Sequence, residues 1–253
     1  MKVTVVGSGT VVPRLERRQS CVVVESGGET VALDLGSGAV RGMLHAGLDP
    51  LALDRIFLTH LHPDHTSDLV PLLFSMNYSD PTTPRESQLM LAGPERFAGF
   101  WRLISDAYLG WLSGGYQATL ELPVRCPAPL DFYGYRLSWA QAKHRPESIA
   151  YRLEEPGGGS LVYTGDTEYS ESVVELARGA HTMIVECSFP DDSPVPGHLT
   201  PQGVARISRE SGVSRVVLTH VFPPADELDL ASEVGRSYDG EVLVARDGLK
   251  LDL

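Results

Sequence analysis

Four side chains that bind metal ions in many proteins lie within the segment THLHPDH, at positions 59–65. They are His60, His62, Asp64 and His65. In an extended chain, side chains two positions apart point the same way, so His60 and His62 can hold one ion. A turn after Pro63 can bring Asp64 and His65 to a second ion nearby. Imidazole nitrogens with carboxylate oxygens suit Zn²⁺, with Mn²⁺ or Fe as alternatives.

Further candidate ligands follow predicted strands elsewhere in the chain. His144 comes shortly after a strand at 131–140, Asp166 directly follows a strand at 160–164, and His220 closes a strand at 214–219. His198 opens the segment HLTPQG, just before a predicted helix at 201–211. Because ligand sites commonly form at the carboxyl ends of strands, we expect these side chains to converge. The remaining histidines, His45 and His181, lack such context and are interpreted as structural.

Two short segments repeat the same pattern. RIFLTHLHP (55–63) and RVVLTHVFP (215–223) each contain an apolar strand that ends in Leu-Thr-His, with a Pro three residues later. The repeat indicates two similar β/α halves that face each other. We therefore predict an α/β fold in which two sheets pack together and helices flank them.

The elements that would position these residues form one domain, 1–253, in which 93–130 is predicted to be a short apolar helical insertion near the active site. Asp34, in LDLGSG, is interpreted as organising a turn. The predicted strands cover 2–6, 20–25, 30–35, 54–60, 87–93, 131–140, 148–154, 160–164, 182–187 and 214–219. The predicted helices cover 40–46, 66–78 (where Pro71 can introduce a kink), 94–111, 170–178 and 201–211.

Charge and composition limit the classes of partner. The formal net charge is −12, which opposes nonspecific binding of a polyanion such as RNA. The three cysteines form no CxxC pair, which is typical of a reducing cytosol. No apolar run approaches the ~20 residues that span a bilayer. We expect a cytoplasmic protein that does not bind membranes.

The pattern HxHxDH at 60–65 resembles the signature of the metallo-β-lactamase superfamily, and the resemblance extends over nearly the whole chain. The branch that it resembles contains ribonuclease Z and related phosphodiesterases. Shared segments are GSGTVVPRLERRQS (7–20), HRPESIAYR (144–152), TGDT (164–167), VECS (185–188), HLT (198–200) and LTH (218–220).

The resemblance implies an αββα sandwich, two mixed β-sheets flanked by helices, that holds two divalent ions, with Zn²⁺ preferred. One ion would be bound by His60, His62 and His144, and the other by Asp64, His65 and His220. Asp166 would bridge the ions. Asp64 and His198 are the predicted catalytic residues, and His198 would lie outside the metal shell on the substrate side.

The expected activity is cleavage of a phosphodiester by a hydroxide that bridges the two ions, with His198 assisting the leaving group. The sequence departs from the ribonuclease branch at Val185, at Glu168 and Tyr169 after GDT, and at 93–130, which lacks Lys and any basic arm. We therefore expect a small phosphodiester or nucleotide as substrate, and RNA is disfavoured. Alternatives are a tRNA 3′-end endonuclease, a hydrolase of thioesters, lactones or lactams, and a member without turnover. The aromatic stretch 97–116 favours a homodimer.

Overall fold

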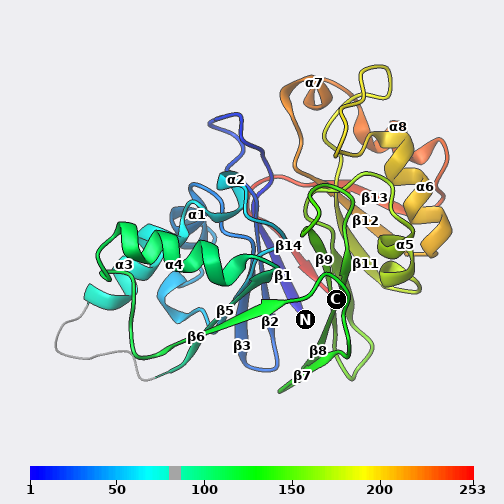
Figure 1. Cartoon of the computed structure of the whole chain (residues 1–253). Helices are drawn as coiled ribbons and strands as arrows, with labels where there is room; N and C mark the ends of the chain where they lie inside the picture. Colours follow the sequence, from blue (N-terminus) through cyan, green and yellow to red (C-terminus); the bar gives the residue numbers. More distant parts are fainter. Residues whose placement is uncertain (80–86) are drawn as a thin grey trace.

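Two β-sheets face each other, and helices cover their outer faces (Figure 1). The computed structural model describes residues 1–79 and 87–253. In Figure 1, α1, α3 and α4 lie on one side of the sheets and α5, α6 and α8 lie on the other. The described helices are α1 (Ala39–His45), the 3₁₀ turn η1 (Pro50–Ala52), α2 (Pro63–Thr66), α3 (Leu69–Tyr78), α4 (Phe97–Ala107), α5 (Glu171–Ala177), α6 (Pro201–Ser211), α7 (Pro223–Asp226) and α8 (Leu230–Gly235).

Both sheets mix parallel and antiparallel pairing. In spatial order, the first consists of β14 (Leu249–Asp252), β1 (Lys2–Gly7), β2 (Cys21–Ser26), β3 (Glu29–Leu33), β4 (Arg55–Phe57), β5 (Leu89–Pro94) and β6 (Gln117–Leu122). The second consists of β13 (Glu241–Val244), β12 (Arg215–Thr219), β11 (Thr182–Glu186), β10 (Ser160–Tyr163), β9 (Ile149–Glu154), β8 (Tyr135–Gln141) and β7 (Leu130–Phe132). Strands β3 to β6 run parallel to one another, as do β10 to β13, whereas the other neighbours are antiparallel. The predicted α/β sandwich of two mixed sheets is confirmed.

Alternation along the strands divides the apolar side chains between three cores. Phe57 of β4 and Val217 of β12 lie in the core between the sheets. Ile56 packs under the helices of the first sheet, and Val216 packs under those of the second. Each such fully buried side chain contributes roughly 1.5–3 kcal/mol relative to exposure. This burial on both faces explains why these strands read as continuous apolar runs.

The repeated segment takes the same local structure in the two sheets. Both β4 and β12 are followed by a short loop and then a one-turn helix that begins at a proline, Pro63 in α2 and Pro223 in α7. Proline suits the first helical position because its missing N–H would be unpaired there. The two halves inferred from the repeat therefore face each other across the central core.

Some elements differ from the prediction. The segment 66–78 is divided at Ser67–Asp68 into α2 and α3, and Pro71 lies in the first turn of α3, where proline is tolerated. The segment 131–140 turns at Gly134, whose φ of 91° suits glycine, so it forms two strands. Helix α4 matches the helical part of 93–130, but 117–122 pairs with β5 as the edge strand β6. Within the described residues, every helix is too short or too polar to span a bilayer.

Candidate metal centre

The predicted ligands gather at one rim of the sandwich, where α2 and α7 lie in Figure 1. Each comes from a segment that follows a strand: β4 leads to the cluster at 60–65, β8 to His144, β10 to Asp166 and β12 to His220. Parallel strands end at the same edge of their sheet, which brings these loops together. Asp34 and His220 have positive φ, 58° and 51°. Such strain in non-glycine residues is often found at functional sites.

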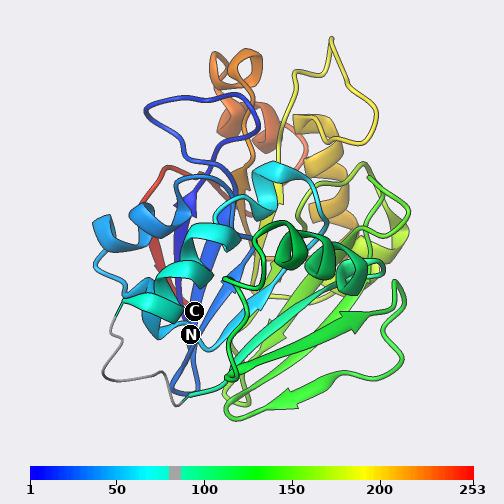
Figure 2. The same ribbon diagram turned by 60° about the vertical axis from the view of Figure 1, so that its left-hand side comes forward.

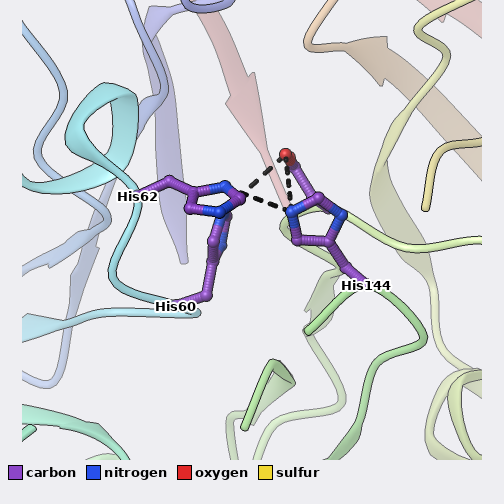
Figure 3. Close-up of side chains that lie close together, drawn as sticks. His60, His62 and His144 are labelled. Atoms are coloured by element: carbon purple, nitrogen blue, oxygen red, sulfur yellow. Dashed lines mark hydrogen bonds and ion pairs between the residues drawn. The ribbon is translucent and has the colours of Figure 1, made fainter. Parts of the chain in front are cut away.

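The first group of ligand atoms surrounds one oxygen of Asp166. Oδ2 of Asp166 lies 3.8 Å from Nε2 of His60 and 3.9 Å from Nε2 of His144. Nδ1 of His62 lies 3.2 Å from Nε2 of His144. The rings of the three histidines converge from two separate loops (Figure 3). Their spacing fits a single cation.

The second group surrounds the other oxygen of the same carboxylate. Oδ1 of Asp166 lies 3.3 Å from Nε2 of His65 and 3.4 Å from Nε2 of His220. Nε2 of His220 is also 3.5 Å from Oδ2 of Asp64. All four of these side chains are buried. Asp166 therefore presents one oxygen to each group.

Hydrogen bonds fix the orientation of the ligand rings. Nδ1 of His65 lies 2.7 Å from Oδ2 of Asp34, and Nδ1 of His144 lies 2.9 Å from the carbonyl oxygen of Gly197. Because both partners accept, each Nδ1 carries the proton and donates it. The Nε2 lone pair of each ring then faces the centre. Metal-binding histidines are commonly oriented in this way.

His60 and His220 follow the same rule through hydroxyl groups. Nδ1 of His60 lies 3.1 Å from Oγ1 of Thr59, and Nδ1 of His220 lies 3.1 Å from Oγ of Ser188. Each hydroxyl can donate its own proton to a buried carboxylate, so its oxygen accepts from the ring. Again Nε2 is left facing the centre.

Several of these inward atoms have no hydrogen-bond partner among the described residues. Nε2 of His60, His65 and His220 and Oδ1 of Asp166 are buried without a hydrogen bond. Buried polar atoms are rarely left unpaired, because each costs about 1–3 kcal/mol. Burial opposes ionisation of Asp166, but the neighbouring His220 and His65 hold its pKa well below the usual range. The donor set fits divalent cations, which would satisfy all four atoms.

His198 lies beside the centre and is held by Glu186, a residue to which the sequence assigned no role. Nδ1 of His198 is 3.1 Å from Oε2 of Glu186 and 3.9 Å from Oδ2 of Asp166. Burial lowers the pKa of His198, but the hydrogen bond and charge of Glu186 outweigh this and raise that pKa to about 9. Glu186 is fully buried and also accepts from the backbone N–H of Thr167 and Leu199. A histidine protonated at neutral pH therefore faces the centre.

Asp34, interpreted as a turn residue, has a second role in supporting the ligands. Besides His65, its carboxylate accepts from the backbone N–H and hydroxyl of Thr59 and from the hydroxyl of Tyr163. Its side chain is fully buried. Asp34 thus joins the loop after β4 to the ring of a candidate ligand.

We expect Asp34→Ala to weaken metal binding by about 10–100-fold, because His65 loses the group that orients it. The free energy of unfolding should also fall by about 1–3 kcal/mol for each donor left unpaired. Metal titration and thermal unfolding would measure the two effects. Asp49→Ala, which removes an exposed side chain that caps η1, is the control. Equal behaviour of the two variants would show that Asp34 does not support the centre.

The αββα fold and the cluster of histidines and aspartates define a metal-dependent hydrolase of the metallo-β-lactamase superfamily. Residues 1–220 match the family described as Anti-Pycsar protein Apyc1, and the chain belongs to this family.

Relatives and solved structures resemble the chain over its full length. Ribonuclease Z of Haloferax volcanii is 27% identical over 312 residues, covering 100% of this chain and 95% of the relative. Protein ML1173 of Mycobacterium leprae is 31% identical, with 100% and 89% covered. The structure of YhfI from Bacillus subtilis has a TM-score of 0.85 at 24% identity, covering 99% of this chain and 98% of YhfI. That of the human short-form tRNase Z has a TM-score of 0.81 at 23% identity, with 100% and 99% covered.

Proposed function

We propose that this protein is a two-metal phosphodiesterase that hydrolyses a small phosphodiester, such as a cyclic nucleotide. The observation that carries the proposal is the divided environment of Asp166, whose two oxygens face two separate groups of unpaired ligand atoms. In this proposal the two oxygens of Asp166 would hold one cation each. Zn²⁺ is the preferred ion because the ligands are mainly imidazoles.

The residues take distinct parts in the proposed reaction. His60, His62 and His144 would hold one ion, and Asp64, His65 and His220 the other. When bound, such ions neutralise charge on the attacked phosphate and lower the pKa of water. An anionic diester gains more from two cations than a neutral ester does.

His198 would donate a proton to the departing alkoxide oxygen. Glu186, whose hydrogen bond and charge raise the pKa of His198 to about 9 against the effect of burial, favours the protonated ring that this role requires. Glu186 holds the ring through Nδ1. The other ring nitrogen, Nε2, would then be the atom that delivers the proton to substrate.

Several features support a small substrate over tRNA. The alignment with Haloferax volcanii ribonuclease Z spans 312 positions although this chain has 253 residues, so that relative carries segments which this chain lacks. The alignment with the Bacillus subtilis probable metallo-hydrolase YhfI spans 251 residues. The stretch 93–130 contains α4 and β6 and has no Lys. With a net charge of −12, long-range attraction of a polyanion is weak.

A substrate panel tests the proposal. We expect a chromogenic phosphodiester and 2′,3′- or 3′,5′-cyclic nucleotides to be hydrolysed, with activity lost in chelator and restored by Zn²⁺ or Mn²⁺. Precursor tRNA, a thioester, a lactone and a chromogenic lactam should react poorly. Efficient tRNA cleavage that is insensitive to salt would favour the endonuclease alternative. Turnover of the carbon esters or the lactam alone would overturn the proposed reaction class.

The expected homodimer remains a prediction. Phe74, Tyr78 and Trp111 contact one another on the surface, with ring centroids 4.9–6.2 Å apart. Their exposed fractions are 46%, 48% and 52%. Exposed apolar groups of this kind favour association.

A further inference from the structure

Glu168 contacts two other segments of the site. Its Oε1 accepts a hydrogen bond of 2.6 Å from the backbone N–H of Gly197, and its Oε2 lies 2.7 Å from Nζ of Lys143. The backbone N–H of Glu168 donates to the carbonyl of Lys143 at 2.8 Å. One side chain with its own backbone therefore joins the segments at 143, 168 and 197.

Each of these three segments carries a residue of the centre. Lys143 precedes His144, Glu168 follows Asp166 by two positions, and Gly197 precedes His198. Asp166 and His144 contribute atoms to one candidate ion site, and His198 is the proposed proton donor. A shift in any one segment would change its distance from the other two.

Gly197 is the point at which Glu168 acts on a metal ligand. The carbonyl oxygen of Gly197 accepts from Nδ1 of His144 at 2.9 Å. The backbone φ of Gly197 is 89°, and a Cβ at this position would lie 2.9 Å from Nδ1 of His144. The backbone thus approaches the His144 ring closely, in a conformation that glycine adopts without strain. Glu168 accepts from the N–H of Gly197, while the carbonyl of Gly197 orients the His144 ring.

Few other hydrogen bonds hold the segment that leads to His198. Figure 2 shows residues 189–198, in yellow, as an extended loop at the rim of the molecule. In the described part of the chain, the hydrogen bonds from 194–197 to residues outside this loop are the two made by Gly197. Beyond it, Leu199 is bonded to Glu186 and Ser188. Without Glu168, the described hydrogen bonds from 194–197 to residues outside this loop would be reduced to the one that Gly197 accepts from His144.

We propose that Glu168 is a positioning residue that sets both the His144 ring toward its ion and the backbone that carries His198. The inference rests on the proposed function for its effect on turnover, but not for its effect on metal binding. The chemistry needed at this position is an acceptor for the N–H of Gly197. An arginine at this position could not supply one, because its side chain has no acceptor.

The test compares Glu168→Met, which removes the acceptor at similar length, with Glu168→Gln, which retains an acceptor oxygen. Glu175→Met is the matched control, because Glu175 is an exposed partner of Arg178 on α5. Retention of bound Zn²⁺ is measured against increasing chelator without substrate. We expect E168M to lose one ion at a chelator concentration about 10–100-fold lower than the concentration that removes this ion from the wild-type protein. E168Q and E175M should resemble wild type.

Turnover of the chromogenic diester gives the second readout. We expect kcat of E168M to fall by about 10–100-fold with KM unchanged, and E168Q to restore most of it. If E168M perturbs the thermal transition, Glu168→Ala replaces it in the same comparison. If E168M retains Zn²⁺ as well as E175M does and has the same kcat, the proposal is overturned. Loss of an ion from E168M, in a protein that hydrolyses no phosphodiester, would instead reject the proposed function and leave the positioning role intact.

Discussion

Replacing Asp166 with alanine is expected to abolish hydrolysis and to release metal from both positions. Each oxygen of this carboxylate lies 3.3–3.9 Å from histidine nitrogens of a different group. If Asp166 is shared by two ions, as proposed, its removal would weaken both sites at once and leave the neighbouring imidazoles without the carboxylate that lies between them. We expect kcat/KM to fall by about 10³-fold or more, since electrostatic stabilisation of the transition state is usually the largest contribution to catalysis and the proposed ions would supply it here. Metal analysis after dialysis and steady-state kinetics would measure both effects.

The control for this variant is Asp131→Ala, which removes an exposed aspartate that is paired with Arg136. It should leave metal content and kinetics at wild-type values. Asp166→Asn adds a finer test, because an amide has one acceptor oxygen and cannot bridge two ions by its oxygens. Full activity of D166A with normal metal content would reject the bridging role.

Replacing His198 with alanine is expected to lower kcat by about 10²–10⁴-fold while both ions stay bound. The ions should stay bound because Nδ1 of His198 is held by Glu186 at 3.1 Å and lies farther, 3.9 Å, from Asp166. The protonated ring would donate its proton to the leaving group. The fall in kcat should therefore be smallest for substrates whose leaving group is a weak base. Measuring kcat for a nitrophenyl and an alkyl leaving group would reveal this difference.

The same variant, H198A, also tests whether His198 is a metal ligand. His198, Asp166 and His220 are close enough to form a ligand group of their own. Loss of one ion from H198A would make His198 a ligand and remove the proton-donor role. His45→Ala, a change in an exposed histidine of α1, should alter neither metal content nor kcat.

The candidate site could be predicted because its residues follow local rules. HxHxDH directly follows an apolar strand, and His144, Asp166 and His220 each follow another, so strand ends alone indicate where they meet. The repeat of Leu-Thr-His predicted two facing halves for the same reason. In both cases the signal lies within a few neighbouring residues.

The supporting residues could not be predicted because their roles depend on distant partners. Asp34 bonds to Tyr163, 129 positions away, and Glu168 bonds to Gly197, 29 positions away. Nothing near either residue in sequence indicates those partners. The edge strands β13 and β14 were missed because they are short and only partly buried, so their apolar pattern is weak.

The most direct test of the central claim is anomalous diffraction from crystals of the protein reconstituted with Zn²⁺. We predict two peaks ~3.5–4 Å apart, with the Asp166 carboxylate between them. One should lie among His60, His62 and His144, and the other among Asp64, His65 and His220. A single peak at full occupancy, or two peaks without Asp166 between them, would contradict the account.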